Sequence, residues 1–185
     1  MEVLGHFIFE LLKITFLGFV YSTVLYYIFK IIPENKKPQP LKSKKILWLF
    51  ISSFLLFYMF TPYGNHGLGD SARIPISYTK EINNINWTKY GILKGIRTND
   101  GNEVELTHFK VKNNTLCGNL SSDFYDFEND YFVYEIDSEK IVEFKNEIDY
   151  NRYAQKNKLP KSNELKSFED NYRDYWSGWR FFLLP

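Results

Sequence analysis

Residues 14–29 read ITFLGFVYSTVLYYIF, and residues 46–60 read ILWLFISSFLLFYMF. Neither stretch contains a charged residue. The first extends back to residue 7, which gives about 23 residues, enough to cross the ~30 Å hydrocarbon core of a bilayer. Two such stretches in one chain are more typical of membrane helices than of buried helices in a soluble protein. The sequence therefore predicts a transmembrane helical hairpin over residues 1–61, with spans at about 7–30 and 44–61.

A basic loop, residues 33–45, separates the two predicted spans. It contains five lysines, one glutamate and three prolines. Lysines beside membrane spans stay on the cytoplasmic side, so we expect this loop to be cytoplasmic and both termini to lie outside. The first ten residues, MEVLGHFIFE, lack the basic start of a cleaved signal peptide. Richness in Lys, Asn, Ile, Phe and Tyr is typical of an AT-rich bacterial genome, so the expected location is a bacterial cytoplasmic (inner) membrane.

Charge is distributed unevenly along the 185 residues, although the formal net charge is only +1. Residues 1–61 carry seven lysines and three glutamates, a net charge of +4, whereas residues 62–185 carry −3. This balance excludes a strongly basic nucleic-acid-binding protein. The single cysteine, Cys117, excludes an intrachain disulfide framework and a multi-cysteine zinc site.

Residues 62–185 have the composition of a soluble α+β domain. Alternating apolar residues predict strands at 72–78, 91–97, 103–111, 115–120, 131–137 and 140–144. Asp100-Gly101 predicts a hairpin turn between the second and third of these, and residues 138–139 a turn between the last two. A proline in the first strand indicates an edge position. The pattern predicts an antiparallel sheet in an extracytoplasmic domain.

Helix signals follow the strands. Asn146 is a candidate N-cap for a helix whose apolar face is Ile148, Tyr150, Tyr153 and Ala154. Residues 167–170 resemble a capping box before a second helix with a buried stripe at residues 168, 172, 175 and 176. Gly178 is placed to end that helix. Residues 179–185 are predicted to be a terminal strand or extended segment packed on the core.

Glu10 and Lys13 are the charged residues of the first predicted span. Three residues apart on a helix, they lie on one face and can form an ion pair. One interpretation is an intramembrane pair at a conduction or partner site. The alternative, favoured by their position near one end of the span, is that both side chains reach the outer headgroups.

Two further segments are candidates for ligand or partner binding. Asp70, Ser71 and Arg73 follow the second span directly, and Arg73 could pair with Asp70 or with a carboxylate of a partner. The alternative is a turn and edge strand with a structural role. Near the C-terminus, Trp179 and Arg180 belong to an aromatic and arginine-rich segment of the kind found at binding hot spots.

No metal, cofactor or catalytic residue is predicted. The three histidines, His6, His66 and His108, lie far apart in the sequence, whereas zinc sites need three or four ligands close together. We expect His108 to be a half-buried sheet residue, although a pH-sensing or ligand role for His66 is conceivable. The acidic run at residues 123–130 lacks the ligand spacing of a calcium loop.

The predicted architecture favours a membrane-anchored, non-enzymatic binding or accessory protein. Its expected partners are the lipid bilayer and a protein of the cell envelope, and no nucleic acid. One alternative is an immunity-type protein that neutralises a toxin at the membrane. Another is a small envelope enzyme, or a subunit of a membrane complex, whose site assembles only in the fold.

Overall fold

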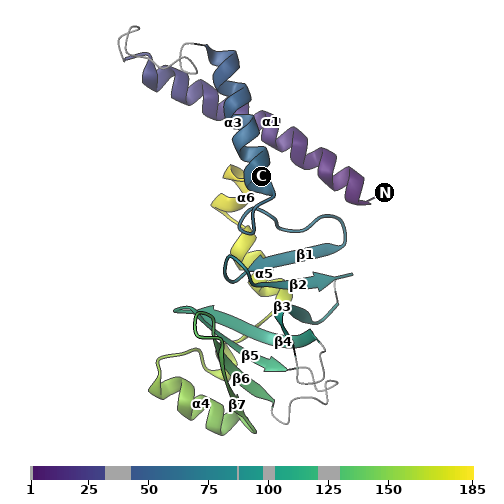
Figure 1. Cartoon of the computed structure of the whole chain (residues 1–185), viewed down its shortest axis with the longest axis vertical. Helices are drawn as coiled ribbons and strands as arrows, with labels where there is room; N and C mark the ends of the chain where they lie inside the picture. The colour runs from purple at the N-terminus through teal and green to yellow at the C-terminus, as the bar shows by residue number, and fades with distance from the viewer. Residues whose placement is uncertain (1, 32–42, 87, 98–102, 121–129) are drawn as a thin grey trace. The chain divides into compact units, whose positions relative to one another are not determined.

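The computed structural model describes residues 2–31, 43–86, 88–97, 103–120 and 130–185 (Figure 1). These residues form two compact units. The hairpin unit comprises Met1–Gly69 and Ser177–Pro185, and the sheet domain comprises Asp70–Trp176. The sheet domain thus begins at Asp70 rather than at residue 62, and the last nine residues belong to the hairpin unit. Most of the basic loop, the turn at 98–102 and most of the acidic run lie outside the described residues.

Helix α1, Glu2–Phe29, is 28 residues long. Among the described residues it alone is long and apolar enough to cross a membrane. Only 22% of its most apolar window is buried inside the structure, whereas the core helix of a soluble protein would be mostly buried. Helix α3, Lys44–Met59, has 16 residues, about 24 Å at 1.5 Å per residue, and is shorter than the predicted second span.

The two helices pack through a small apolar cluster of Ile14, Leu17, Leu55 and Met59. They approach closely at Gly18, where an added Cβ atom would lie 2.2 Å from the Ser52 hydroxyl oxygen. Small residues let helices approach in this way in membranes. The Trp48 indole N–H also donates to the carbonyl oxygen of Thr15, 3.2 Å away. The contact surface is therefore narrow and specific, and most of the remaining apolar side chains point outward.

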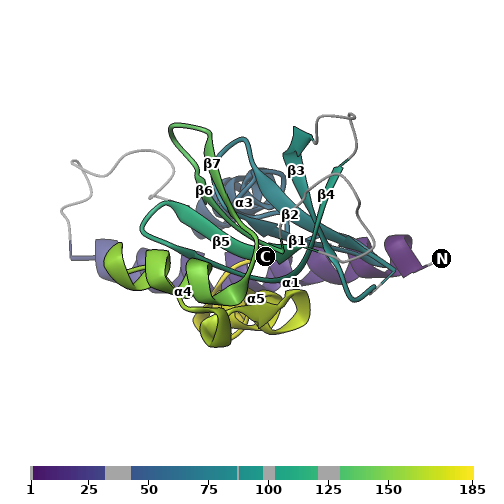
Figure 2. The same cartoon turned by 90° about the horizontal axis from the view of Figure 1, so that it is seen from below.

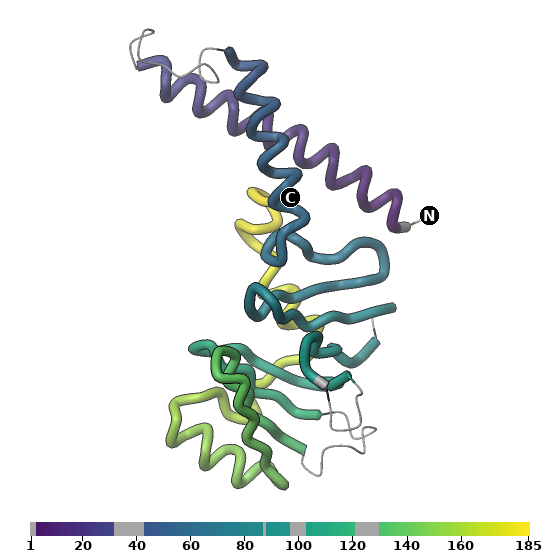
Figure 3. The backbone as a smooth tube through the Cα atoms, in the orientation of Figure 1, coloured from purple at the N-terminus to yellow at the C-terminus, as the bar shows by residue number. Residues whose placement is uncertain are grey.

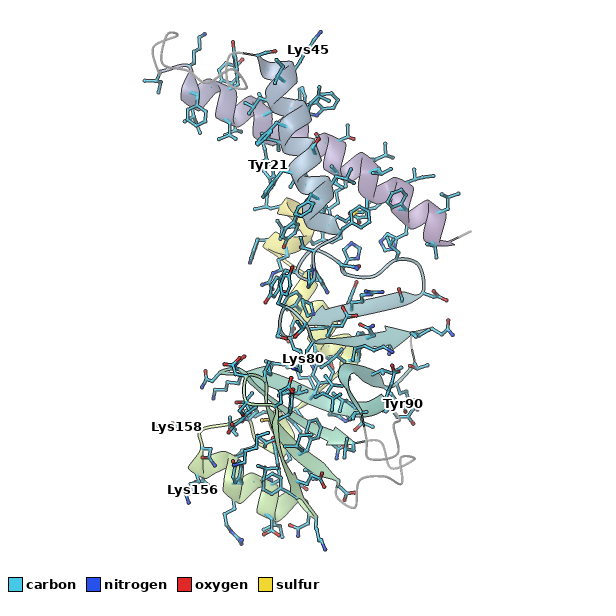
Figure 4. All side chains as sticks on the ribbon, viewed as in Figure 1. Tyr21, Lys45, Lys80, Tyr90, Lys156 and Lys158 are labelled. Atoms are coloured by element: carbon cyan, nitrogen blue, oxygen red, sulfur yellow. The ribbon has the colours of Figure 1, made fainter. Side chains whose placement is uncertain are left out.

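The C-terminal segment is a helix rather than the expected strand or extended chain. Helix α6, Trp179–Leu183, follows Gly178, whose φ of 64° and ψ of −135° suit glycine but differ from the left-handed helical conformation of a helix-ending C′ residue. The Tyr21 hydroxyl donates to the carbonyl oxygen of Leu183 at 2.6 Å, and the Lys13 ammonium lies 5.1 Å from the centre of the Phe181 ring. These contacts hold α6 to α1, and Figure 3 shows the yellow C-terminal tube returning to the helices. Tyr21 is labelled in Figure 4.

The second unit is an antiparallel sheet with strand order β1-β2-β3-β4-β5-β6-β7. A short strand, β8, pairs with β4 outside this order. The strands are β1 (Ser71–Pro75), β2 (Glu81–Ile85), β3 (Gly91–Arg97), β4 (Glu103–Lys112), β5 (Thr115–Leu120), β6 (Tyr131–Glu135), β7 (Lys140–Phe144) and β8 (Lys166–Ser167).

Most of the predicted strands and both predicted strand pairings are confirmed. Strand β3 pairs with β4 and β6 with β7, and β1 is an edge strand that ends at Pro75. Strands β2 and β8 were not predicted. Strand β2, sequence EINNI, contains two asparagines, which disfavour strands, and forms because both of its neighbours pair with it.

The sheet is strongly twisted, as the view from below shows (Figure 2). It also curls, so that Lys80, just before β2, forms an ion pair with Glu139 in the β6–β7 turn at 2.5 Å. The hydrogen bond to Glu139 raises the pKa of Lys80, so this ammonium stays charged at any physiological pH. The main core lies inside the curl and consists of apolar side chains from β1 to β6 together with Phe168.

Two helices complete the domain, and each begins at its predicted cap. Helix α4, Glu147–Lys156, has Asn146 as N-cap, whose side chain accepts from the N–H of Asp149 at 2.9 Å. It contacts β6 and β7 and buries Tyr150 and Ala154, but Ile148 is 71% exposed, so its place on the buried face was predicted wrongly. Helix α5, Phe168–Trp176, is capped by Ser167, whose hydroxyl accepts from the N–H of Asp170 at 3.2 Å.

The buried stripe predicted for α5 is found in the sheet domain. Phe168 and Trp176 are buried, and Tyr172 and Tyr175 pack against the main core. The indole N–H of Trp176 donates to the carbonyl oxygen of Arg73 at 2.7 Å, which fixes the end of α5 to β1.

Candidate functional site

A groove of about 440 Å³ opens on the surface of the sheet domain where β4 changes partners. Leu106 of β4 pairs with Gly91 of β3, whereas two residues further on His108 pairs with Ser167 of β8. The groove lies at this change, and its volume is within the range of small-molecule and peptide sites. It is lined by Thr88, Lys89, Tyr90, Thr107, His108, Ser167, Phe168 and Glu169.

A β-bulge in β4 determines which side chains face the groove. Between Leu106 and His108 the pairing with β5 shifts by one residue, because Leu106 lies opposite Leu120 and His108 opposite Asn119. The shift keeps both Leu106 and Phe109 in the core, although they are three residues apart. His108 is exposed rather than half-buried as expected from the sequence. The Thr107 hydroxyl donates to the carbonyl oxygen of Asn119 at 3.2 Å.

Each wall of the groove is fastened by an asparagine side chain. On one side Asn84, 1% exposed, donates through Nδ2 to the carbonyl oxygens of Thr88 and Tyr90, both at 2.7 Å. On the other side Asn171 donates through Nδ2 to the carbonyl oxygens of Lys166 and Ser167 at 3.0 and 2.9 Å. These hydrogen bonds hold the chain segments on both sides of the change. Tyr90, on the first wall, is labelled in Figure 4.

Replacing Asn84 by leucine should loosen the first wall. Two carbonyl oxygens would lose their hydrogen-bond donor. Leaving a buried acceptor unpaired lowers the free energy of unfolding by about 1–3 kcal/mol. We expect the amides of residues 88–90 to exchange hydrogen faster in Asn84→Leu, measured by mass spectrometry. The neighbouring Asn83→Ala is the control and should leave that exchange unchanged, because the Asn83 side chain donates to Glu81 at 3.0 Å and not to the wall of the groove.

The groove offers mixed chemistry to a ligand. Lys89 and Glu169 supply opposite charges, and both are exposed. Phe168 is buried to 2% exposure and forms an aromatic floor, held against Phe109 with ring centres 6.4 Å apart. Gly91 makes room for it, since an added Cβ atom would lie 3.0 Å from the Phe168 ring. Such a surface suits a polar ligand with an apolar side group more than a purely apolar one.

The candidate segment at Asp70, Ser71 and Arg73 begins β1 and is separate from the residues that line the groove. Arg73 lies 3.5 Å from Glu81 of β2, a charge partner that was neither of the two considered from the sequence, Asp70 or a carboxylate of a partner. Asp70 is exposed, and its carbonyl oxygen accepts from the N–H of Asn86 at 2.9 Å. This geometry agrees with the structural alternative, an edge strand and its turn.

Trp179 and Arg180 lie in α6, in the hairpin unit. Trp179 is 61% exposed, and the Arg180 guanidinium lies 5.2 Å from the centre of its ring. Phe181 and Phe182 are also more than half exposed. The segment therefore presents an aromatic surface with one cation, which is compatible with the predicted contact role.

Glu10 and Lys13 lie on one face of α1 as predicted, with Lys13 Nζ 3.8 Å from Glu10 Oε2. The Glu10 carboxylate also has two histidine neighbours that were not predicted. His6 Nε2 lies 3.8 Å from Glu10 Oε1, and His66 Nε2, from the segment after α3, lies 3.5 Å from the same oxygen. The i, i+4 spacing of His6 and Glu10 was visible in the sequence, but His66 is brought in only by the fold.

Cys117 and Tyr150 form a buried pair with a structural role. Cys117 is fully buried, and burial raises the pKa of its thiol to about 11, so it remains protonated and unreactive at neutral pH. Burial likewise raises the pKa of the Tyr150 phenol, which donates to the carbonyl oxygen of Pro160 at 2.6 Å. The pair holds α4 against β5 and β6.

Comparison with known proteins gives no relative from which a function could be transferred. No protein-family model, curated protein sequence or solved structure matches the chain.

Proposed function

We propose that this chain is a membrane-anchored, non-enzymatic binding protein whose sheet domain binds a polypeptide segment of an envelope protein in the groove at β4. In this proposal α1 and α3 both span the inner membrane, with the basic loop inside and the sheet domain outside. The observation that carries the binding function is the groove itself, with two hydrogen-bonded walls and an aromatic floor.

The exposed apolar surface of the hairpin supports the membrane anchor. Along α1 and α3, large apolar side chains stay more than 45% exposed on several sides of each helix. A soluble protein rarely leaves such a surface uncovered, whereas lipid covers it without cost. The side chains in question are Val3, Leu4, Ile8, Phe9, Leu12, Phe16, Phe19, Val24, Tyr27, Ile28, Ile46, Leu49, Phe50, Phe54 and Phe57.

The chemistry of the groove supports a polypeptide as ligand. Up to Leu106, one edge of β4 pairs with β3. Beyond Leu106, the same edge pairs with only the two residues of β8. An extended segment can align beside such an interrupted edge and use side-chain pockets for specificity. Lys89 and Glu169 provide opposite charges for its polar groups, and Phe168 provides a surface for an apolar residue.

Site-specific photocross-linking in intact cells tests this proposal. A photoreactive amino acid at His108, in the groove, should give a discrete cross-linked product. The same group at Ile148, exposed on α4, should not. Charge reversal by Lys89→Glu should reduce the His108 product at least tenfold without lowering the amount of protein in the membrane.

The outcome also separates the candidate functions. Equal products at His108 and Ile148, or a His108 product that is unaffected by Lys89→Glu, would contradict binding in the groove. A toxin as the cross-linked partner would identify the binding as that of an immunity-type protein.

A further inference from the structure

We propose that His6, Glu10 and His66 form a binding site for a divalent transition-metal ion of the zinc class. One ligand atom from each of these residues lies within 4.8 Å of the other two. Two imidazoles and one carboxylate are a ligand set that binds Zn²⁺ with a fourth position left for water or another ligand. The proposal differs from the expectation of no metal site, which was based on the spacing of histidines along the chain.

The distances are close to those of a loaded site. Zinc bonds of 2.0–2.1 Å in tetrahedral geometry place neighbouring ligand atoms about 3.4 Å apart. Glu10 Oε1 is 3.5 Å from His66 Nε2 and 3.8 Å from His6 Nε2, and the two imidazole ring centres are 5.2 Å apart. Both imidazoles therefore face the same carboxylate oxygen, and small side-chain movements would bring all three atoms to one ion.

The burial of Glu10 is the second observation that points to a ligand. Its side chain is only 3% exposed, and Oε2 is buried and makes no hydrogen bond. A buried carboxylate without full hydrogen bonding is costly unless another charge compensates it. Lys13 Nζ forms an ion pair with Oε2 at 3.8 Å but lies beyond hydrogen-bond distance, so the hydrogen bonding of the carboxylate stays incomplete. A metal ion on Oε1 would compensate the negative charge of the carboxylate. Lys13 would then lie beside Oε2 as an outer partner of the kind that metal-ligating carboxylates have.

A small cavity lies next to His66, although His6 and Glu10 do not line it. This cavity of about 70 Å³ is lined by His66 and by its neighbours in the segment after α3. This volume exceeds what one water molecule needs. His66 is itself 13% exposed, so the site is shielded from solvent without being sealed.

Metal binding would change one hydrogen bond of the present structure. The N–H of Gly69 donates to His6 Nδ1 at 3.1 Å, so the proton of the neutral ring is on Nε2, which faces Glu10. Coordination by Nε2 requires that proton to move to Nδ1, with no net change in protonation. The Gly69 N–H then loses its acceptor. Metal binding should therefore release the Gly69 amide from His6 of α1 and accelerate its hydrogen exchange.

Zinc titration of the full-length protein in detergent tests the site, using a purification tag without histidine. The wild type should bind one Zn²⁺ per chain in competition with a chromogenic chelator. Glu10→Gln and His66→Gln should each weaken this binding at least about tenfold. His108→Gln, which removes an exposed histidine of the sheet domain, is the matched control and should bind like the wild type. Thermal unfolding without metal checks that each variant is folded.

X-ray absorption at the zinc edge identifies the ligands of the ion in the wild-type protein, so this test does not depend on the variants. The bound ion should show only nitrogen and oxygen neighbours, including two imidazoles. Hydrogen exchange at Gly69 should increase when zinc is added. The proposal is overturned if the wild type binds zinc no more tightly than Glu10→Gln and His66→Gln do. It is also overturned if the bound ion lacks two imidazole neighbours.

Discussion

A chain whose only cysteine is Ile148→Cys, in a Cys117→Ser background, should react with a membrane-impermeant thiol reagent in intact cells with a permeable outer envelope. A chain whose only cysteine is Gln39→Cys should not react. The reason is the lysine content of residues 33–45, which favours the cytoplasmic side for this loop and the outer side for the sheet domain. Ile148 is suitable because it is 71% exposed on α4. Labelling is read as a mass shift of the purified protein.

The native cysteine provides a built-in control for this experiment. Cys117 is fully buried, so the wild-type chain should remain unlabelled in intact cells. Both introduced cysteines should react once the membrane is dissolved. If Gln39→Cys reacts in intact cells and Ile148→Cys does not, the topology is inverted, the sheet domain is cytoplasmic, and cytosolic partners replace envelope proteins as the ligands to look for.

Phe109→Ala should destabilise the sheet domain more than any surface change. Phe109 is 1% exposed and packs against Phe168, so its removal leaves a large cavity between β4 and α5. Truncation of a buried phenylalanine costs about 3–5 kcal/mol. For a domain of this size the melting temperature should fall by more than about 10 °C, measured by near-UV circular dichroism. Phe168, the aromatic floor of the groove, should lose the ring that packs against it in the same variant.

Val111→Ala is the matched control because it lies in the same strand. Val111 is 39% exposed, so truncation should lower the free energy of unfolding by less than about 1 kcal/mol. Equal shifts of the melting temperature in the two variants would show that Phe109 is not part of the packed core.

The sequence predicted those elements whose local pattern agrees with their tertiary environment. Helix α4 begins after Asn146 and α5 after Ser167 because each cap satisfies a backbone N–H that the helix itself leaves unpaired. Strand β2 was missed because its pairing comes from neighbours rather than from its own residues. The helical C-terminal segment was missed because its contacts with Tyr21 and Lys13 of α1 bridge more than 160 residues of chain.

The candidate sites were harder to predict than the fold. The groove depends on a one-residue shift in β4 and on the replacement of β3 by β8, and neither has a local sequence signature. For the metal site, the relation between His6 and Glu10 can be read from helical spacing, but His66 follows another helix. Arg73 illustrates the opposite case, because a short sequence distance suggested Asp70 as its partner and strand pairing provided Glu81 instead.

The contact between α6 and α1 has a consequence for the order in which the chain is made. Residues 177–185 emerge from the ribosome only after the whole sheet domain, yet they complete the hairpin unit. The Tyr21 hydroxyl therefore lacks the Leu183 carbonyl oxygen throughout synthesis of residues 30–182. The hairpin unit is therefore incomplete until residues 177–185 have been made, so its contacts between α6 and α1 form only after the sheet domain has been synthesised.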